Sequence, residues 1–247
     1  MDAAAWDEFY SRTELVWGAP PDDTVVEQVF GLERRFPDGP HAVGEPRPEL
    51  PRALDLGCGE GRNALWLATH GWAVDAIDYS QAGVDKGRTV ASRLSRSVRS
   101  RIRWHWADVN ELDRAGITGP YELILIAHLH LPAEQRRALL LRAADLLVPE
   151  GVLVVLGNDP ANLTEGHGGE QDPALLFTPD DIVAELGPAR DDLDIRVAER
   201  VRRATENRDA IDSLVVATRP GPPPIRDDAE LEGLGVDGPD ESAAPPR

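Results

Sequence analysis

The sequence has a single cysteine, Cys58, and no long apolar run. One cysteine cannot form an intramolecular disulfide framework, and such sparse use of cysteine fits a reducing compartment. No apolar stretch approaches the roughly 18 residues that a membrane span requires. Residues 1–8 lack the basic and apolar regions of a secretion signal. We therefore expect a cytoplasmic protein with no membrane partner.

Positive charge is also scarce, and lysine occurs once, at Lys86. Lysine and arginine together number 26 against 44 aspartates and glutamates, which gives a net charge of −18. An acidic surface repels phosphate backbones, so we expect no nucleic-acid partner. Arginines gather between residues 88 and 103, but no stacking aromatics are interleaved with them before Trp104. We interpret this segment as a solvated helix face.

What the sequence does contain is a regular alternation of apolar strands and amphipathic helices. Strands are expected at 53–56, 74–78, 102–108, 121–127, 152–156, 195–201 and 213–218. Helices are expected at 62–70, 81–97 and 132–147, and a further helix begins at Thr178. This alternation predicts an α/β, Rossmann-like fold with a seven-stranded, mostly parallel, doubly wound sheet.

Composition divides the chain into three parts. Residues 1–45 contain two short helical segments around a turn at 18–21, and we expect them to form an N-terminal helical cap. Residues 46–219 form the α/β domain, entered through a proline-rich linker. Residues 220–247 are acidic and rich in proline with little apolar content, so we expect a disordered tail.

The segment 53–68 combines a short apolar strand, a glycine turn and the start of a helix. Glycines stand at every second position of the turn, at Gly57, Gly59 and Gly61, where the backbone can adopt angles that a Cβ forbids. The dinucleotide-binding fingerprint would require a glycine at position 62, which is Arg62 here. The first N–H groups of the following helix have no partner within the helix and suit an anionic group.

The resulting pattern, Asp-x-Gly-x-Gly-x-Gly over residues 55–61, resembles motif I of the class I S-adenosylmethionine-dependent methyltransferases. The resemblance extends over about residues 50–219 and implies S-adenosyl-L-methionine as the cofactor and a sheet with one antiparallel strand. Residues 55–64, the following Gly-Trp-Ala-Val and the N-terminal Trp-Gly-x-Pro look like the branch that contains tellurite-resistance and thiopurine-type methyltransferases. The branch implies a small-molecule acceptor, and the sequence leaves the oligomeric state open.

The glycine turn and the helix after it are expected to bind the methionine half of the cofactor. Gly57, Cys58 and Gly59 offer their backbone to the carboxylate. Asp55, or a carbonyl of the turn, suits the ammonium group. Arg62 either assists the carboxylate electrostatically or is a solvated arginine in the first helical turn.

Two further strand tips are expected to bind the adenosine half. Ligands of open parallel sheets lie at the carboxyl ends of the strands. Asp78 ends the second strand and can accept hydrogen bonds from both ribose hydroxyls, and Tyr79 beside it can pack on the adenine. The resemblance implies that Asp108 binds the adenine amino group and that Val109 lines the ring.

Histidines follow the central strand, where the resemblance places the methyl group opposite its acceptor. His128 and His130 are candidate general bases, and His167 in a glycine-rich loop is a candidate acceptor contact. Each of the three can instead serve only as a structural hydrogen-bonding group. The N-terminal aromatics Tyr10 and Trp17 either pack on the domain or line the acceptor pocket beneath a cap.

Several alternatives bear on the function. The sequence has no His-Glu-x-x-His motif and no cysteine pair, so we expect no metal. Residues 128–132 differ from the Asn/Asp-Pro-Pro-Tyr/Phe motif, which argues against methylation of amino groups in DNA or of protein glutamine. A non-catalytic S-adenosylmethionine-binding module and a nucleotide-dependent oxidoreductase remain alternative functions.

Overall fold

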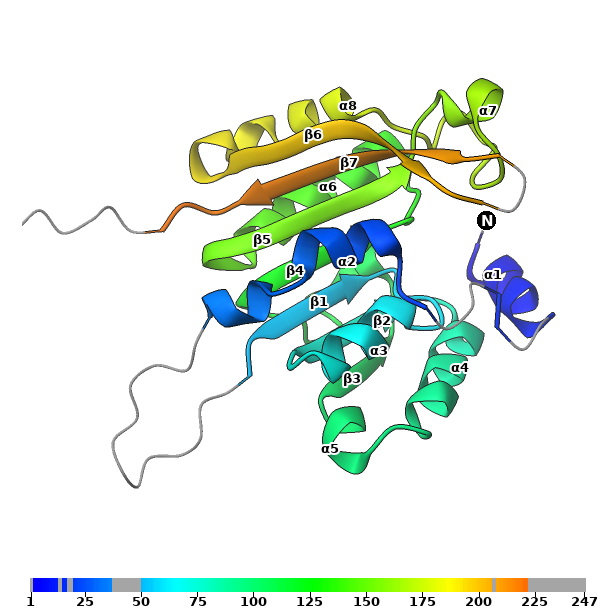
Figure 1. Cartoon of the computed structure of the whole chain (residues 1–247), viewed down its shortest axis with the longest axis vertical. Helices are drawn as coiled ribbons and strands as arrows, with labels where there is room; N and C mark the ends of the chain where they lie inside the picture. Colours follow the sequence, from blue (N-terminus) through cyan, green and yellow to red (C-terminus); the bar gives the residue numbers. More distant parts are fainter. Residues whose placement is uncertain (1, 13–14, 17–19, 37–49, 206–207, 222–247) are drawn as a thin grey trace, which may run out of the picture.

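The computed structural model describes residues 2–12, 15–16, 20–36, 50–205 and 208–221 (Figure 1). Trp17 and most of the predicted C-terminal tail lie outside these ranges. No helix in the described ranges is long and apolar enough to cross a membrane.

One sheet organises the described part of the chain. Its seven strands have the spatial order β3-β2-β1-β4-β5-β7-β6. The strands are β1 (Arg52–Leu56), β2 (Ala73–Asp78), β3 (Ile102–Trp106), β4 (Tyr121–Ala127), β5 (Leu147–Asn158), β6 (Asp194–Arg203) and β7 (Ala210–Thr218). The first five strands pair in parallel, whereas β7 is antiparallel to both of its neighbours. The predicted seven-stranded α/β sheet is confirmed, as a mixed sheet whose largest part is parallel.

Helices cover both faces of the sheet (Figure 1). They are α1 (Ala3–Ser11), α2 (Asp23–Val29), α3 (Arg62–Thr69), α4 (Gln81–Ala91), α5 (Arg96–Arg99), α6 (Ala133–Asp145), α7 (Asn162–Glu165) and α8 (Pro179–Glu185), with 3₁₀ turns η1 (Leu32–Arg35), η2 (Val109–Glu111) and η3 (Gly187–Asp192).

Alternate residues of the central strands supply two separate apolar cores. On one face, Leu54 and Ile124 belong to a cluster that includes Leu140 of α6. On the other face, Ala53 and Leu123 belong to a cluster that includes residues of α2 and α3. Because side chains of a strand alternate between the two faces, continuous apolar strands need this double cover.

The predicted helix 81–97 is two helices. After α4 ends at Ala91, the amides of Arg93 and Leu94 bond to carbonyls three residues back, which tightens the chain into a turn. Ser95 then accepts a hydrogen bond from the Val98 amide and caps α5. The local capping serine therefore overrides the helical periodicity of the segment.

The two N-terminal helices have different surroundings. Val25 and Val29 of α2 are fully buried in the core on one face of the sheet. In contrast, α1 packs against α4 (Figure 1). The Asp7 carboxylate accepts hydrogen bonds from Ser80 Oγ at 2.6 Å and from the Ala82 amide at 3.0 Å. These contacts hold α1 beside the carboxyl end of β2.

Candidate functional site

The glycine turn between β1 and α3 is closely surrounded. Gly59 and Gly61 have φ of +53° and +78°. A Cβ on Gly59 would lie 2.5 Å from the hydroxyl of Tyr10, and one on Gly61 would lie 2.3 Å from the ring of Trp104. Both the backbone conformation and the neighbours therefore require glycine at these two positions.

Four backbone amides of the turn already have partners. The amides of Gly57 and Cys58 donate to the Ile77 carbonyl at 2.9 and 3.0 Å, and that of Gly61 donates to the Cys58 carbonyl at 2.8 Å. The Gly59 amide donates to Asp78 Oδ2 at 2.8 Å. These bonds fix the shape of the turn and leave the start of α3, with Arg62, as its electropositive element.

Asp55 is a buried carboxylate with one unsatisfied oxygen. Its side chain sits near the end of β1, the residue is 2% exposed, and Oδ2 has no hydrogen-bond partner among the described residues. Burial, with a smaller contribution from the nearby charge of Asp78, raises the pKa of Asp55 to about 7 despite the lowering effect of the Ala64 amide in α3. An orphaned buried acceptor is rare and costly. It fits a ligand that brings a cation, as the ammonium of S-adenosylmethionine does.

The carboxylate of Asp78, at the tip of β2, accepts hydrogen bonds from two backbone amides. Oδ2 accepts from Gly59, and Oδ1 accepts from the Ser80 amide at 2.8 Å. Burial raises the pKa of Asp78 despite these bonds. Burial, with the charge of Asp78 second, likewise raises the pKa of Tyr79 to about 12, so its phenol stays protonated. Asp78 thus joins the tip of β2 to the glycine turn.

A cavity of about 440 Å³ opens over the glycine turn. This volume lies within the range of small-molecule sites. Its walls come from α1, the turn, the ends of β4, β5 and β6, and the loop after α7. The lining residues are Trp6, Phe9, Tyr10, Gly57, Cys58, Gly59, Glu60, Arg62, Asn63, Ala127, His128, His130, Asn158, His167, Gly168, Gly169, Glu170, Gln171, Arg203 and Thr205.

The structure thus brings eight of the predicted site residues to one cavity, hereafter the turn cavity. They are Tyr10, Gly57, Cys58, Gly59, Arg62, His128, His130 and His167. The thiol of Cys58 is buried, and burial raises its pKa well above the ordinary value, so it remains a neutral small side chain at the turn.

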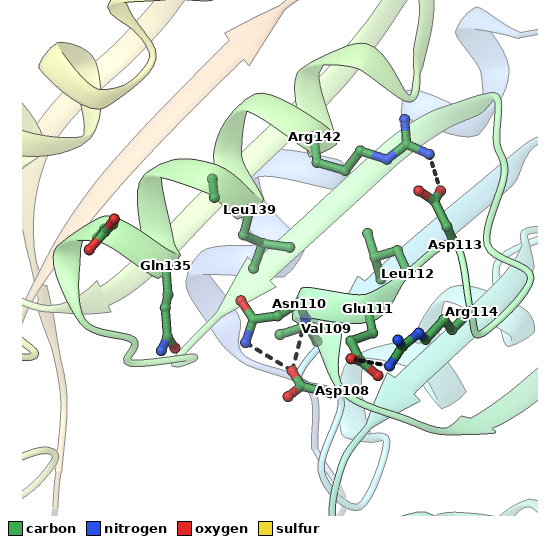
Figure 2. A pocket seen from close by; sticks show the side chains of 12 residues that line it. Asp108, Val109, Asn110, Glu111, Leu112, Asp113, Arg114, Gln135, Leu139 and Arg142 are labelled. Atoms are coloured by element: carbon green, nitrogen blue, oxygen red, sulfur yellow. Dashed lines mark hydrogen bonds and ion pairs between the residues drawn. The ribbon is translucent and has the colours of Figure 1, made fainter.

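Asp108 and Val109 lie in a different cavity, of about 930 Å³, between η2 and α6 (Figure 2). There Asp108 Oδ1 accepts hydrogen bonds from the Asn110 amide at 2.8 Å and from Asn110 Nδ2 at 2.9 Å. Leu139 of α6 faces them across this cavity (Figure 2). On the other side, Leu129 lies against Gly57, 3.0 Å from the position of a Cβ there. Of the predicted cofactor set, Gly57, Cys58, Gly59 and Arg62 therefore line one cavity and Asp108 and Val109 line another, whereas Asp55, Asp78 and Tyr79 line neither of the two.

His128 follows the last residue of β4 and has φ of +57°, in the left-handed region. Its Nε2 lies 3.1 Å from Oδ2 of Asp22. Asp22 belongs to the N-terminal segment, and only 2% of this residue is exposed. Burial alone would raise the pKa of Asp22, but the hydrogen bond to His128 and the charges of Arg62 and Arg203 lower it to about 2. Asp22 is therefore ionised at neutral pH.

His130 differs from His128 in its partner and its burial. Its Nε2 accepts a hydrogen bond from the Asn158 amide at 3.0 Å, which places the ring proton on Nδ1. Burial, followed by the charge of His128, lowers the pKa of His130 to about 4. His130 is therefore a neutral group whose acceptor nitrogen is already used.

Arg62 is engaged on one side by Asp22, at 3.1 Å. The sequence patterns assign Asp22 no role at the site. Its place before an apolar helix is typical of an N-cap, and its Oδ1 does accept a hydrogen bond from the Thr24 amide at 3.0 Å. Asn158 and Arg203 were also missed, because neither belongs to a local motif. Among the described residues, no three His, Cys, Asp or Glu side chains are grouped to hold a metal ion.

Comparisons with known proteins identify what this chain is similar to. Residues 53–151 match the family model described as a methyltransferase domain. The N-methyltransferase NodS from Bradyrhizobium japonicum WM9, in complex with S-adenosyl-L-homocysteine, superposes with a TM-score of 0.60 at 17% identity, covering 88% of this chain and 98% of NodS. An S-adenosylmethionine-dependent methyltransferase from Methanosarcina mazei gives a TM-score of 0.55 at 16% identity, covering 69% of this chain and 93% of the other.

A curated relative matches a shorter segment. Hemagglutinin 1 of Eikenella corrodens is 37% identical over 73 residues, which is 30% of this chain and 22% of that protein. The match thus spans about a fifth of that relative's length. Residues 53–151 thus match a methyltransferase domain, and the superpositions show the fold of S-adenosylmethionine-dependent methyltransferases. The chain has the class I S-adenosylmethionine-dependent methyltransferase fold, with a methyltransferase domain at residues 53–151.

Proposed function

We propose that this protein transfers a methyl group from S-adenosylmethionine to a small-molecule acceptor in the turn cavity. The observation that carries the proposal is the glycine turn with the unpartnered, buried oxygen of Asp55 behind it. The methyltransferase-domain match and the similarity to an N-methyltransferase support it. The tellurite-resistance and thiopurine-type branch is the finer assignment, and it rests on the sequence of the turn.

Each predicted cofactor residue has a role in this proposal. Asp55 pairs with the ammonium of the methionine half, and Arg62 with the start of α3 attracts its carboxylate. Gly57, Cys58 and Gly59 shape the floor on which this half lies. When bound, S-adenosylmethionine supplies a methyl group on a positively charged sulfur that is already a good leaving group.

The adenosine half is assigned to the strand tips. Asp78 holds the ribose hydroxyls, and Tyr79 packs on the adenine. Asp108 and Val109 complete the adenine site from the neighbouring cavity. Much of the rate enhancement would come from holding donor and acceptor in line.

The acceptor is assigned to the side of the turn cavity lined by α1 and the loop after α7. Within the predicted cap of residues 1–45, α1 then covers the acceptor, and Tyr10 and His167 contact it, whereas α2 packs in the core. Trp17, the other predicted acceptor contact, lies outside the described residues. His128 is the better candidate for a general base, because the acceptor nitrogen of His130 is bonded to Asn158. The proposed partners are a small molecule, with neither nucleic acid nor membrane.

Two measurements test this function against its alternatives. S-Adenosylhomocysteine should raise the melting temperature and NAD(P) should not, because only a ligand of the native state stabilises it. Stabilisation by NAD(P) alone would instead identify a nucleotide-dependent oxidoreductase. Transfer of a labelled methyl group into a panel of small acceptors separates the enzyme from a non-catalytic binding module, which would bind S-adenosylhomocysteine and transfer no label.

A further inference from the structure

Asp22 links the N-terminal segment to the tip of the central strand. It precedes α2, yet its carboxylate contacts His128 at the end of β4 and Arg62 at the start of α3. Its own amide donates to Asn63 Oδ1 at 3.1 Å. The Asp22 side chain is fully buried, whereas 21% of the His128 side chain remains exposed and lines the turn cavity. One buried charge thus sits behind one exposed imidazole.

The backbone at His128 serves this contact. A left-handed conformation at a non-glycine residue costs on the order of 1–3 kcal/mol and persists only where the surroundings impose it. Here β4 ends at Ala127, and the His128 amide donates to the Leu156 carbonyl at 2.7 Å, which keeps the chain at the sheet. The turn at φ +57° then directs the imidazole toward Asp22 rather than along the strand.

The hydrogen bond selects one tautomer of the ring. An ionised carboxylate can only accept, so the proton of the Asp22–His128 bond belongs to Nε2. In neutral His128 the lone pair is then on Nδ1, and among the described residues Nδ1 has no hydrogen-bond partner. A base needs this combination of a fixed tautomer and an open nitrogen.

We propose that Asp22 is a positioning residue that holds His128 as the general base for a hydroxyl-bearing acceptor, an inference that rests on the proposed function. His128 Nδ1 takes the hydroxyl proton as the acceptor oxygen bonds to the methyl carbon. The carbon–sulfur bond breaks, and sulfur keeps its electron pair, so the products are the methyl ether, S-adenosylhomocysteine and an imidazolium. Asp22 stabilises that imidazolium until it releases its proton to water.

The chemistry of the cavity favours a hydroxyl, and in particular a phenol. A neutral amine or a thioether attacks with a free lone pair and needs no base in the step, whereas a hydroxyl must lose its proton. The wall that α1 contributes is aromatic: Trp6 stacks on Tyr10 with ring centroids 5.5 Å apart, and Phe9 packs edge-on against Trp6. Such a wall suits a planar, apolar acceptor body.

The first test needs neither cofactor nor acceptor. Nitrogen-15 spectra of the wild-type protein, at a pH where the imidazole is neutral, should place the His128 proton on Nε2. Asp22→Asn should lose this preference, because the amide can donate as well as accept. Asp159→Asn is the matched control, since Asp159 is also fully buried and paired with an arginine, Arg200, but does not contact His128. A wild-type proton on Nδ1 overturns the proposal.

The second test separates the proposal from the function on which it rests. Labelled S-adenosylmethionine is offered with simple phenols or with thioethers and tertiary amines, which carry no proton to lose. We expect transfer to phenols, with kcat about 10²-fold lower in Asp22→Asn and in His128→Asn. Asparagine is chosen at position 128 because it tolerates positive φ. Asp159→Asn should retain wild-type kcat within about threefold.

The outcomes differ for the two ideas. S-Adenosylhomocysteine binding with transfer only to thioethers or tertiary amines, or with no transfer to phenols, refutes the Asp22–His128 assignment and leaves the cofactor assignment intact. Absence of S-adenosylhomocysteine binding refutes the proposed function, and the nitrogen spectra then still decide whether Asp22 positions His128. A folded Asp22→Asn variant with unchanged kcat on a phenol also overturns the proposal.

Discussion

Asp55 and Asp75 are buried to the same degree on adjacent strands and have opposite surroundings. Each is 2% exposed, in β1 and β2 respectively. Asp75 accepts from Arg52 at 3.2 Å, from Arg103 and His105 at 2.8 Å, and from the Tyr121 hydroxyl at 3.0 Å. Asp55, in contrast, keeps one oxygen without a partner among the described residues.

The pKa values of the two carboxyl groups differ in the direction that their hydrogen-bond donors predict. Burial alone would raise the pKa of Asp75, but its bonds to His105, Arg103 and Tyr121 hold it well below the ordinary range. Burial raises that of Asp55 to about 7. Burial therefore does not distinguish a structural carboxylate from a functional one, whereas the supply of donors does. Asp75 fastens β1, β3 and β4 to β2, and Asp55 is left for a ligand.

Removal of the Asp75 carboxylate, which accepts hydrogen bonds from four side chains, should have the largest effect on stability. Asp75→Ala leaves Arg52, His105 and the Tyr121 hydroxyl without their common acceptor, and breaking a buried ion pair from one side costs about 3–5 kcal/mol. Urea unfolding should show a loss of this size in the free energy of unfolding. The affinity for S-adenosylhomocysteine, measured on the folded fraction, should not change. A loss under about 1 kcal/mol would mean that Asp75 does not fasten these strands.

The unsatisfied carboxylate should instead give stability a distinctive pH dependence. Asp55 has a folded pKa of about 7 against an ordinary value of 3.8. Between these values the native state holds more protons than the unfolded chain, so the Asp55 contribution to the free energy of unfolding falls as pH rises from about 4 to about 7. Three pKa units correspond to about 4 kcal/mol, and we expect on the order of 2 kcal/mol after relaxation.

Asp55→Asn isolates this contribution. Unfolding of the wild type and the variant at pH 5 and pH 8 gives a difference in which other titrating groups cancel. The variant should gain stability relative to the wild type at pH 8. Asp75→Asn is the matched control, because Asp75 is ionised in the native and the unfolded state at both pH values and its difference should be the same at pH 5 and pH 8. The stability that Asp75 contributes is lost only as pH falls below its ordinary pKa of 3.8. Equal differences at pH 5 and pH 8 would contradict a raised pKa of Asp55.

The same comparison shows what sequence patterns can predict. Strand and helix periodicity predicted the sheet, and the glycine spacing predicted the turn, because both depend on neighbours in sequence. The spacing could not predict which carboxylate would find donors. Asp55 and Asp75 both follow a leucine or valine in an apolar strand, and the partners of Asp75 come from three other strands.

The Asp22–His128 contact was out of reach for a related reason. The two residues are 106 positions apart, and no local pattern connects an N-cap aspartate to a strand tip. The separation of Gly57, Cys58, Gly59 and Arg62 from Asp108 and Val109 into two cavities likewise depends on how distant elements pack, which local sequence does not determine. Sequence patterns predict the order of the helices and strands and the types of residue at the strand ends. Which tips meet is decided by packing.

Asp78 is intermediate between Asp75, which has several side-chain donors, and Asp55, which has an unpartnered oxygen. Its substitution should have the smallest effect of those considered. Its two oxygens each accept a backbone amide, yet burial raises its pKa. Asp78→Ala should weaken S-adenosylhomocysteine binding at least tenfold, about 1.4 kcal/mol, because charge-assisted bonds to the ribose hydroxyls are lost. Isothermal titration calorimetry measures this change.

A ligand that lacks both ribose hydroxyls decides between two origins of that loss. If Asp78 binds the hydroxyls, the 2′,3′-dideoxy analogue of S-adenosylhomocysteine should bind the wild type and Asp78→Ala with similar affinity, because the contact is absent in both. If Asp78 only shapes the glycine turn through Gly59, the variant should lose the same factor with both ligands. The second result would make Asp78 a structural carboxylate like Asp75, and Asp55 would then be the one buried aspartate of the three assigned to a ligand.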